Sequence, residues 1–215
     1  MTFSRWLSDL VRSSLGVGVR RLRSVSATIG VIGADSRLAQ SFGSFGRGSA
    51  LLFPQGVIYN EKYIRIGSGT LVGPDVCLTV GMGPSQEMLT NPVVSIGDRC
   101  VIGRGSHVIG HWSIEIGDDI QTGPYVYITD QNHGYEDLNV PVGLQPTKEA
   151  AVRIGSGSWL GANCVILPGT DLGRCCVVAA GAVVRGSFPD HTVVAGVPAR
   201  AIREFKDGEW RRPKG

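Results

Sequence analysis

Histidines are the residues of this chain best suited to proton transfer near neutral pH, because imidazole is the side chain that changes charge most readily there. The chain has four of them, His107, His111, His133 and His191. His133 lies in a polar stretch, residues 129–153, where a neutral ring could take the proton of a hydroxyl group that attacks a carbonyl carbon. A histidine in such a stretch is often only a solvated surface residue, so its surroundings must decide between the two interpretations.

Covalent catalysis has less support in the sequence. A serine or cysteine nucleophile needs a neighbouring base to activate it, and no such pairing is visible along the chain. The five cysteines show no CxxC spacing, and their odd number favours reduced thiols in the cytoplasm over a disulfide framework. We therefore expect a transferred group to pass directly to an acceptor hydroxyl, without a covalent enzyme intermediate.

The composition indicates an unusual core. Aromatic residues make up 7% of the 215 residues, charged residues make up 18%, and glycine occurs 31 times. Aliphatic side chains must therefore fill the interior, with many turns between short segments. A net charge of +3, without an aromatic-interleaved basic stripe, argues against nucleic-acid binding. No apolar run has the length of a membrane span and the N-terminus lacks signal-peptide features, so we expect a cytoplasmic protein.

A six-residue repeat explains this composition. Aliphatic residues occupy every sixth position over residues 154–184, and the same spacing recurs in earlier segments. Glycine often follows the aliphatic residue, where we expect it to help the chain turn a corner. A small or β-branched residue recurs four positions after the aliphatic one, and Cys100, Cys164 and Cys176 are among these. The period predicts an all-β fold, a parallel β-helix with three short strands per triangular coil and buried cysteines at the small positions.

The repeat is interrupted twice. Residues 79–95 contain Gly, Pro and Asn, and their role stays open. Residues 129–153, which hold His133, form a break that a tight solenoid would keep only for a function, because insertions gather on the binding face. We expect a β-helix over residues 29–190 with an active-site loop at 129–153. A C-terminal extension, residues 191–215, would follow, with a charged tail that is a short helix or disordered.

Residues 1–28 follow a different pattern. Apolar residues with helical spacing occur there among five arginines, namely Trp6, Leu7, Leu10, Val11 and Leu15. One interpretation is a helix or arm that packs on the first coil and caps its open end, and the glycines at 16 and 18 favour it because they weaken a long helix. The other is a basic amphipathic segment that lies on a membrane, which would bring the protein to the inner membrane surface.

Three stretches together resemble a known enzyme family. They are residues 116–136 with the histidine loop, residues 154–161 with a Ser-Trp-Leu-Gly sequence, and residues 195–200, Ala-Gly-Val-Pro-Ala-Arg. They resemble the maltose and galactoside O-acetyltransferase group of the hexapeptide-repeat acyltransferases, and more closely its branch that acetylates cell-surface polysaccharide precursors. The resemblance covers residues 50–205 or so. It implies a left-handed coil, acetyl-CoA as co-substrate, a sugar or glycan acceptor, and a homotrimer.

The resemblance also assigns residues. His133 would be the general base, while Asp130, Asn132 and His111 would lie on the acceptor side or orient that base. Other positions match the family's coenzyme-binding residues, namely Trp159, Ala162, Ala180, Arg185, Gly186, Arg200 and Arg203. The family often has Thr-Lys where Arg185 and Gly186 stand, which leaves the roles of these two open. No metal is expected to be required for catalysis.

Two other functions stay open on the same scaffold. A zinc carbonic anhydrase of the hexapeptide-repeat type would need three histidines that converge on one ion, and His107, His111 and His133 are available. The close histidine pair of that family is not found at its expected spacing, whereas the tryptophan coil and the Ala-Gly-Val-Pro ending favour acyl transfer. The second alternative is a non-catalytic solenoid used for assembly.

Overall fold

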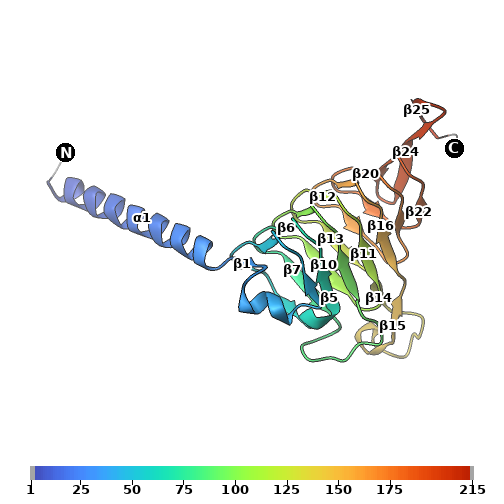
Figure 1. Ribbon diagram of the computed structural model, residues 1–215, viewed down its shortest axis with the longest axis horizontal. Coiled ribbons are helices and arrows are strands. Elements are labelled where there is room, and N and C mark those ends of the chain that lie inside the picture. The colour runs from blue at the N-terminus through green and yellow to red at the C-terminus, as the bar shows by residue number, and fades with distance from the viewer. Residues whose placement is uncertain (1–2, 214–215) are drawn as a thin grey trace.

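The computed structural model describes residues 3–213, with side chains described from residue 15 onward. The chain forms a left-handed parallel β-helix, a prism whose three walls are sheets of stacked short strands (Figure 1). Each coil adds one strand to each wall, and strands from successive coils pair in parallel register, as Tyr127 does with Val165. The fold expected from the six-residue period, with the hand implied by the resemblance, is confirmed.

The three walls are named here sheets A, B and C. Sheet A has ten strands: β1 (Ile32–Gly33), β3 (Ala50–Leu51), β6 (Leu71–Val72), β9 (Val101–Ile102), β12 (Gln121–Thr122), β17 (Trp159–Leu160), β20 (Val177–Val178), β23 (Thr192–Gly196), β24 (Ala199–Lys206) and β25 (Glu209–Arg211). Sheet B has seven: β2 (Ser44–Phe45), β5 (Ile64–Ile66), β8 (Val94–Ile96), β11 (Ile114–Ile116), β16 (Val152–Ile154), β19 (Asp171–Leu172) and β22 (Ser187–Phe188). Sheet C has six: β4 (Ile58–Tyr59), β7 (Cys77–Val80), β10 (His107–Gly110), β13 (Tyr127–Thr129), β18 (Val165–Ile166) and β21 (Val183–Val184).

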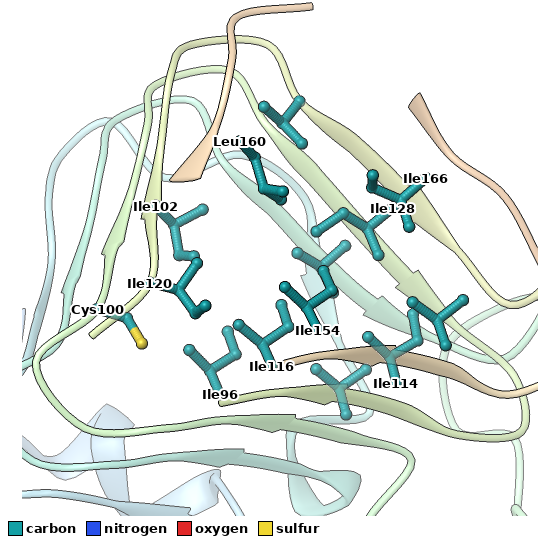
Figure 2. Packing of buried hydrophobic residues seen from close by; sticks show 14 of the residues in the cluster. Ile96, Cys100, Ile102, Ile114, Ile116, Ile120, Ile128, Ile154, Leu160 and Ile166 are labelled. Carbon is teal, nitrogen blue, oxygen red and sulfur yellow. The ribbon is translucent and has the colours of Figure 1, made fainter. Parts of the chain in front are cut away.

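Aliphatic side chains from all three sheets fill the prism, as Figure 2 shows for one section of it. Leu160 and Ile166 are completely buried, and so are the cysteines at the predicted small positions, Cys100, Cys164 and Cys176. Burial raises the pKa of the Cys164 thiol to about 12, which keeps that thiol protonated. These cysteines therefore act as small core residues, as the repeat predicts.

The glycines that follow the inward aliphatic residues have a different purpose from the one expected. Their φ angles are not positive, so they do not supply the turn. Instead their backbone lies against the next coil, and a Cβ on Gly103 would lie 2.3 Å from the carbonyl oxygen of Gly123. The left-handed backbone occurs two residues later, at Gly105 (φ 65°) and Tyr125 (φ 59°). The close stacking of coils therefore requires glycine at the first position.

The N-terminal helix α1 (Phe3–Ile29) extends away from the prism and does not cover its open end (Figure 1). Four of the apolar side chains considered in the sequence lie outside the described ones, Trp6, Leu7, Leu10 and Val11. Leu15 is exposed. For the described part of α1 the capping expectation is wrong. The 3-10 helix η1 (Arg37–Ser41) stands at the first coil instead, with Ala39 and Phe42 buried.

The C-terminal segment is a pair of strands, so the expected helix or disorder is wrong. β24 pairs antiparallel with β23, and β25 pairs antiparallel with β24, which prolongs sheet A beyond the last coil. The open edge of β23 offers unpaired backbone groups, and pairing with β24 satisfies them. The rings of Phe205 and Trp210 lie edge to face with centroids 5.5 Å apart and hold the two strands together.

Candidate active site

The second break in the repeat forms a hairpin that carries His133. Its strands, β14 (Gln131–His133) and β15 (Thr147–Glu149), pair antiparallel, with Thr147 opposite His133. Between them lie the 3-10 helix η3 (Val142–Leu144) and an otherwise irregular loop. The hairpin leaves the prism between β13 of sheet C and β16 of sheet B, an edge called here the C–B edge. His133 is exposed there, which leaves its imidazole free to meet a substrate.

A buried carboxylate fixes the base of this hairpin. Asp130 has no exposed surface, and its two oxygens accept backbone N–H groups from three consecutive residues of the preceding coil. The distances are 2.8 Å to His111, 2.8 Å to Trp112 and 2.7 Å to Ser113. Burial raises the pKa of Asp130 above its ordinary value, and the three N–H groups oppose that rise. The carboxylate is fully engaged, so its geometry suits positioning of the hairpin rather than contact with an acceptor.

A second contact joins the hairpin to the same corner. The Nδ1 atom of His111 contacts Oε1 of Glu149, which lies on β15. The His111 side chain is 15% exposed and the Glu149 side chain is 29% exposed. Glu149 pairs across the hairpin with Gln131, two residues before His133. The sequence pointed to His111 as an acceptor-side or orienting residue but not to Glu149, since a glutamate in an aperiodic loop gives no signal. Asn132 lies exposed, in register with Lys148.

The first break in the repeat, whose role was open, lies at the same edge, one coil before the His111 corner and two coils before the hairpin. Residues 81–93 connect β7 of sheet C to β8 of sheet B. Thr90 donates a hydrogen bond from Oγ1 to the Trp112 carbonyl at 2.6 Å, and Gln131 Nε2 lies 3.4 Å from the sulfur of Met82. The first loop, the His111 corner and the hairpin therefore form one continuous surface at the C–B edge.

The residues matched to coenzyme binding lie mainly elsewhere on the prism. Ala162 and Ala180 stand one coil apart between sheets A and C, called here the A–C edge, where Gly181 N–H donates to the Ala162 carbonyl at 2.9 Å. Trp159 points outward from sheet A in register with Val177, and 47% of its surface is exposed. These three form a strip along the later coils, away from the edge that carries His133.

The four remaining candidates occupy two further places. Arg185 and Gly186 follow β21, so they lie at the C–B edge in the last coil. Arg200 and Arg203 are exposed on β24, where Arg203 pairs in register with Val193. The two groups stand at the C-terminal end of the solenoid, and guanidinium groups there suit a polyanion such as nucleotide phosphates.

The histidines do not converge on a common point. The His107 ring lies 6.1 Å from the Tyr127 ring on sheet C, and His111 is paired with Glu149. Within the part of the chain that is described, no group of three or more His, Cys, Asp or Glu side chains is arranged to hold a metal ion. The arrangement offers one exposed histidine on a fixed hairpin, which can act as a base toward a bound hydroxyl.

Two family models match the chain. Residues 93–129 match the model described as "Hexapeptide repeat of succinyl-transferase", and residues 151–186 match "Bacterial transferase hexapeptide (six repeats)". A solved structure, a hexapeptide-repeat acetyltransferase of Vibrio cholerae in complex with acetyl-CoA, superposes with a TM-score of 0.53. It is 27% identical, and the match covers 79% of this chain and 74% of that one.

Curated relatives point the same way. "Putative lipopolysaccharide biosynthesis O-acetyl transferase WbbJ" of Escherichia coli is 37% identical over 66% of this chain and 76% of its own length. The galactoside O-acetyltransferase of Escherichia coli is 26% identical over 70% of this chain and 68% of its own. Together with the β-helix and the exposed histidine on its hairpin, these similarities identify the chain as a member of the hexapeptide-repeat acetyltransferases, in the maltose/galactoside O-acetyltransferase-like group.

Proposed function

We propose that this protein transfers the acetyl group of acetyl-CoA to a hydroxyl of a sugar or glycan precursor, with His133 as general base. The observation that carries the proposal is the hairpin itself. It exposes one imidazole, and the buried Asp130 carboxylate ties its base to the solenoid through three N–H groups. Such a fixed histidine is what proton abstraction from a weak nucleophile needs. The relatives named for lipopolysaccharide and galactoside acetylation support a sugar acceptor.

The transfer is a direct displacement at the thioester carbonyl. His133 takes the hydroxyl proton as the acceptor oxygen forms its bond to the acetyl carbon. The carbon–sulfur bond then breaks, and the departing thiolate of coenzyme A receives a proton. Burial holds the thiols of Cys100 and Cys176 protonated by raising their pKa values, so neither is suited to attack as a nucleophile.

We assign the pantetheine arm to the A–C edge and the nucleotide phosphates to the C-terminal end. The backbone of Ala162 and Ala180 would meet the arm, with Trp159 beside the thioester end. Arg200 and Arg203 on β24 would face the phosphates, because guanidinium forks pair well with phosphate oxygens. Alanine at the two edge positions leaves the backbone accessible to a ligand that lies along it.

We also infer that the protein works as a homotrimer in the cytoplasm. His133 and the A–C strip lie on different edges of one prism, so one protomer alone does not bring base and coenzyme together. A neighbour that offers its A–C edge to the C–B edge of the first would complete the site. Exposed apolar residues on sheet A, including Leu71 and Val101, suit such a contact. The free cysteines of the described chain agree with a reducing compartment.

The test is release of coenzyme A thiol, corrected for hydrolysis, across a panel of sugars, nucleotide sugars and glycolipids, with the ester product identified by mass spectrometry. An accepted sugar should be acetylated on oxygen, and His133→Ala should lower kcat by about 10²–10⁴-fold. His191→Asn is the matched control, since His191 has a φ of 57° that asparagine tolerates. Unchanged transfer by His133→Ala would refute the general base, and stoichiometric zinc with carbon dioxide hydration would replace the proposal altogether.

A further inference from the structure

The described part of α1 presents a row of apolar side chains to solvent. Leu22 is 71% exposed and Ile29 is 79% exposed, although both are large aliphatic residues. The helix runs away from the prism (Figure 1) and joins it at Gly30, whose carbonyl accepts a hydrogen bond from Gln55 Nε2 at 2.7 Å. The row therefore has no partner within the protomer, and only a surface outside the protomer could bury it.

The row follows one face of the helix. Leu15, Leu22 and Ile29 are spaced by seven residues, and Val25 lies between the last two on the same face. At 100° per residue, Arg20 falls opposite the row, while Arg21 and Arg23 flank it on its two sides. An apolar face bordered by long cationic side chains is the pattern of a helix that lies in a lipid interface, because arginine can keep its head group at the polar level.

The charge of the chain is concentrated in this helix. Residues 3–29 hold five of the 21 basic residues and one of the 18 acidic residues, so the rest of the chain carries a net charge of −1. No helix among the described residues is long and apolar enough to cross a membrane. The surface that complements α1 is thus apolar beneath and anionic above, which describes a bilayer with acidic head groups.

A bundle of α1 helices from several copies fits less well. Gly18 lies on the apolar face between Leu15 and Leu22, where a helix bundle would need a side chain to fill its core. Arg21 and Arg23 flank the row on both sides, so neighbouring helices would bring like charges together, and Asp9 is the sole acid of the helix to offset them.

We propose that α1 binds the surface of an anionic membrane, with its apolar row in the interface and its arginines at the phosphates. The binding does not depend on the acetyl-transfer site. In a trimer, three such helices would act together, so weak single contacts would add up to firm attachment. This assignment replaces the capping role that the sequence left open.

The experiment is flotation of the full chain with vesicles of phosphatidylcholine alone or with added phosphatidylglycerol. The chain should float with the anionic vesicles and much less with the neutral ones, and salt should weaken the binding. Arg21→Glu with Arg23→Glu should lower the partition coefficient at least about tenfold, and Leu22→Asp with Val25→Asp should abolish flotation. Leu38→Asp is the control, because Leu38 is 64% exposed but lies on η1.

The substitutions should not unfold the protein, because the substituted side chains are exposed and α1 extends away from the prism. The melting temperature and acetyl transfer should be unchanged in all variants. Equal binding to neutral and anionic vesicles, or equal binding by the α1 variants and the parent, would overturn the proposal. A smaller oligomer for Leu22→Asp with Val25→Asp, without any vesicle binding by the parent, would instead show that α1 packs against a second copy.

Discussion

Replacement of Asp130 by asparagine should loosen the hairpin that carries His133. Asparagine keeps the shape but has one carbonyl oxygen, so it can replace the oxygen that accepts from Trp112 and Ser113. Its NH2 group then faces the N–H of His111, which loses its acceptor. An unsatisfied buried donor costs about 1–3 kcal/mol. Loss of the negative charge also weakens the two remaining bonds, while it relieves the burial of that charge.

We therefore expect the free energy of unfolding to fall by about 2 kcal/mol, which lowers Tm by about 4–8 °C for a domain of this size. Differential scanning calorimetry or denaturant unfolding measures this. Asp190→Asn is the matched control, because Asp190 is exposed and one oxygen accepts one N–H, from Arg174 at 2.8 Å. Equal melting temperatures for the two variants would refute the role of Asp130 in fixing the base of the hairpin.

The pH dependence of this effect has a definite sign. Burial raises the pKa of Asp130, so the carboxyl ionises at a higher pH in the folded protein than in the unfolded one. Its contribution to the free energy of unfolding is therefore largest in acid and is reduced as pH rises through the window between the two pKa values. The deficit of Asp130→Asn relative to the parent should shrink from about pH 4 toward neutrality. A deficit that grows over this range would contradict the raised pKa.

Three further results are expected. Gly103→Ala should destabilise the coil stack by about 1–3 kcal/mol in denaturant unfolding, because its Cβ would lie 2.3 Å from the next coil's backbone; a neutral effect would contradict the close stacking. In the native protein an exposed-thiol reagent at about pH 8 should modify Cys175 rapidly but not Cys164, whose pKa is raised to about 12; rapid labelling of Cys164 would contradict its burial. Glu149→Gln should weaken the His111 contact and lower the free energy of unfolding by up to about 1 kcal/mol. It should also lower kcat severalfold with an unchanged KM for acetyl-CoA. A change confined to KM would contradict the positioning role of Glu149.

The six-residue period was sufficient to predict a parallel β-helix, although not its hand, because every coil repeats the same local pattern. Every sixth aliphatic from Ile154 to Val184 lies in the core, and the three cysteines at small positions are buried as expected. The purpose of the glycines was misjudged, because the clearance between Gly103 and the next coil is a property of stacking that the local sequence does not express.

The site was predictable only in part. His133 stands out as a candidate because it lies where the repeat is interrupted, and the motif around it resembles a family. The contacts that hold its hairpin could not be predicted, because they join residues far apart in the sequence in loops without a repeat. Glu149 and His111 are 38 positions apart, and Thr90 and Trp112 are 22 positions apart. The position of α1 was equally hidden, because an amphipathic pattern describes a face and not the surface that covers it.

In the proposed trimer the site is shared between protomers, with His133 of one protomer acting on coenzyme held at the A–C edge of its neighbour. Mixing His133→Ala subunits with Ala180→Trp subunits, whose new side chain would block the A–C edge, tests this directly after unfolding and joint refolding. Each parent should be nearly inactive. A random mixture in equal amounts should recover about a quarter of the wild-type acetyl transfer, because that fraction of subunit contacts joins an intact base to an intact coenzyme edge. A mixture that stays at the background of its parents would contradict the shared site.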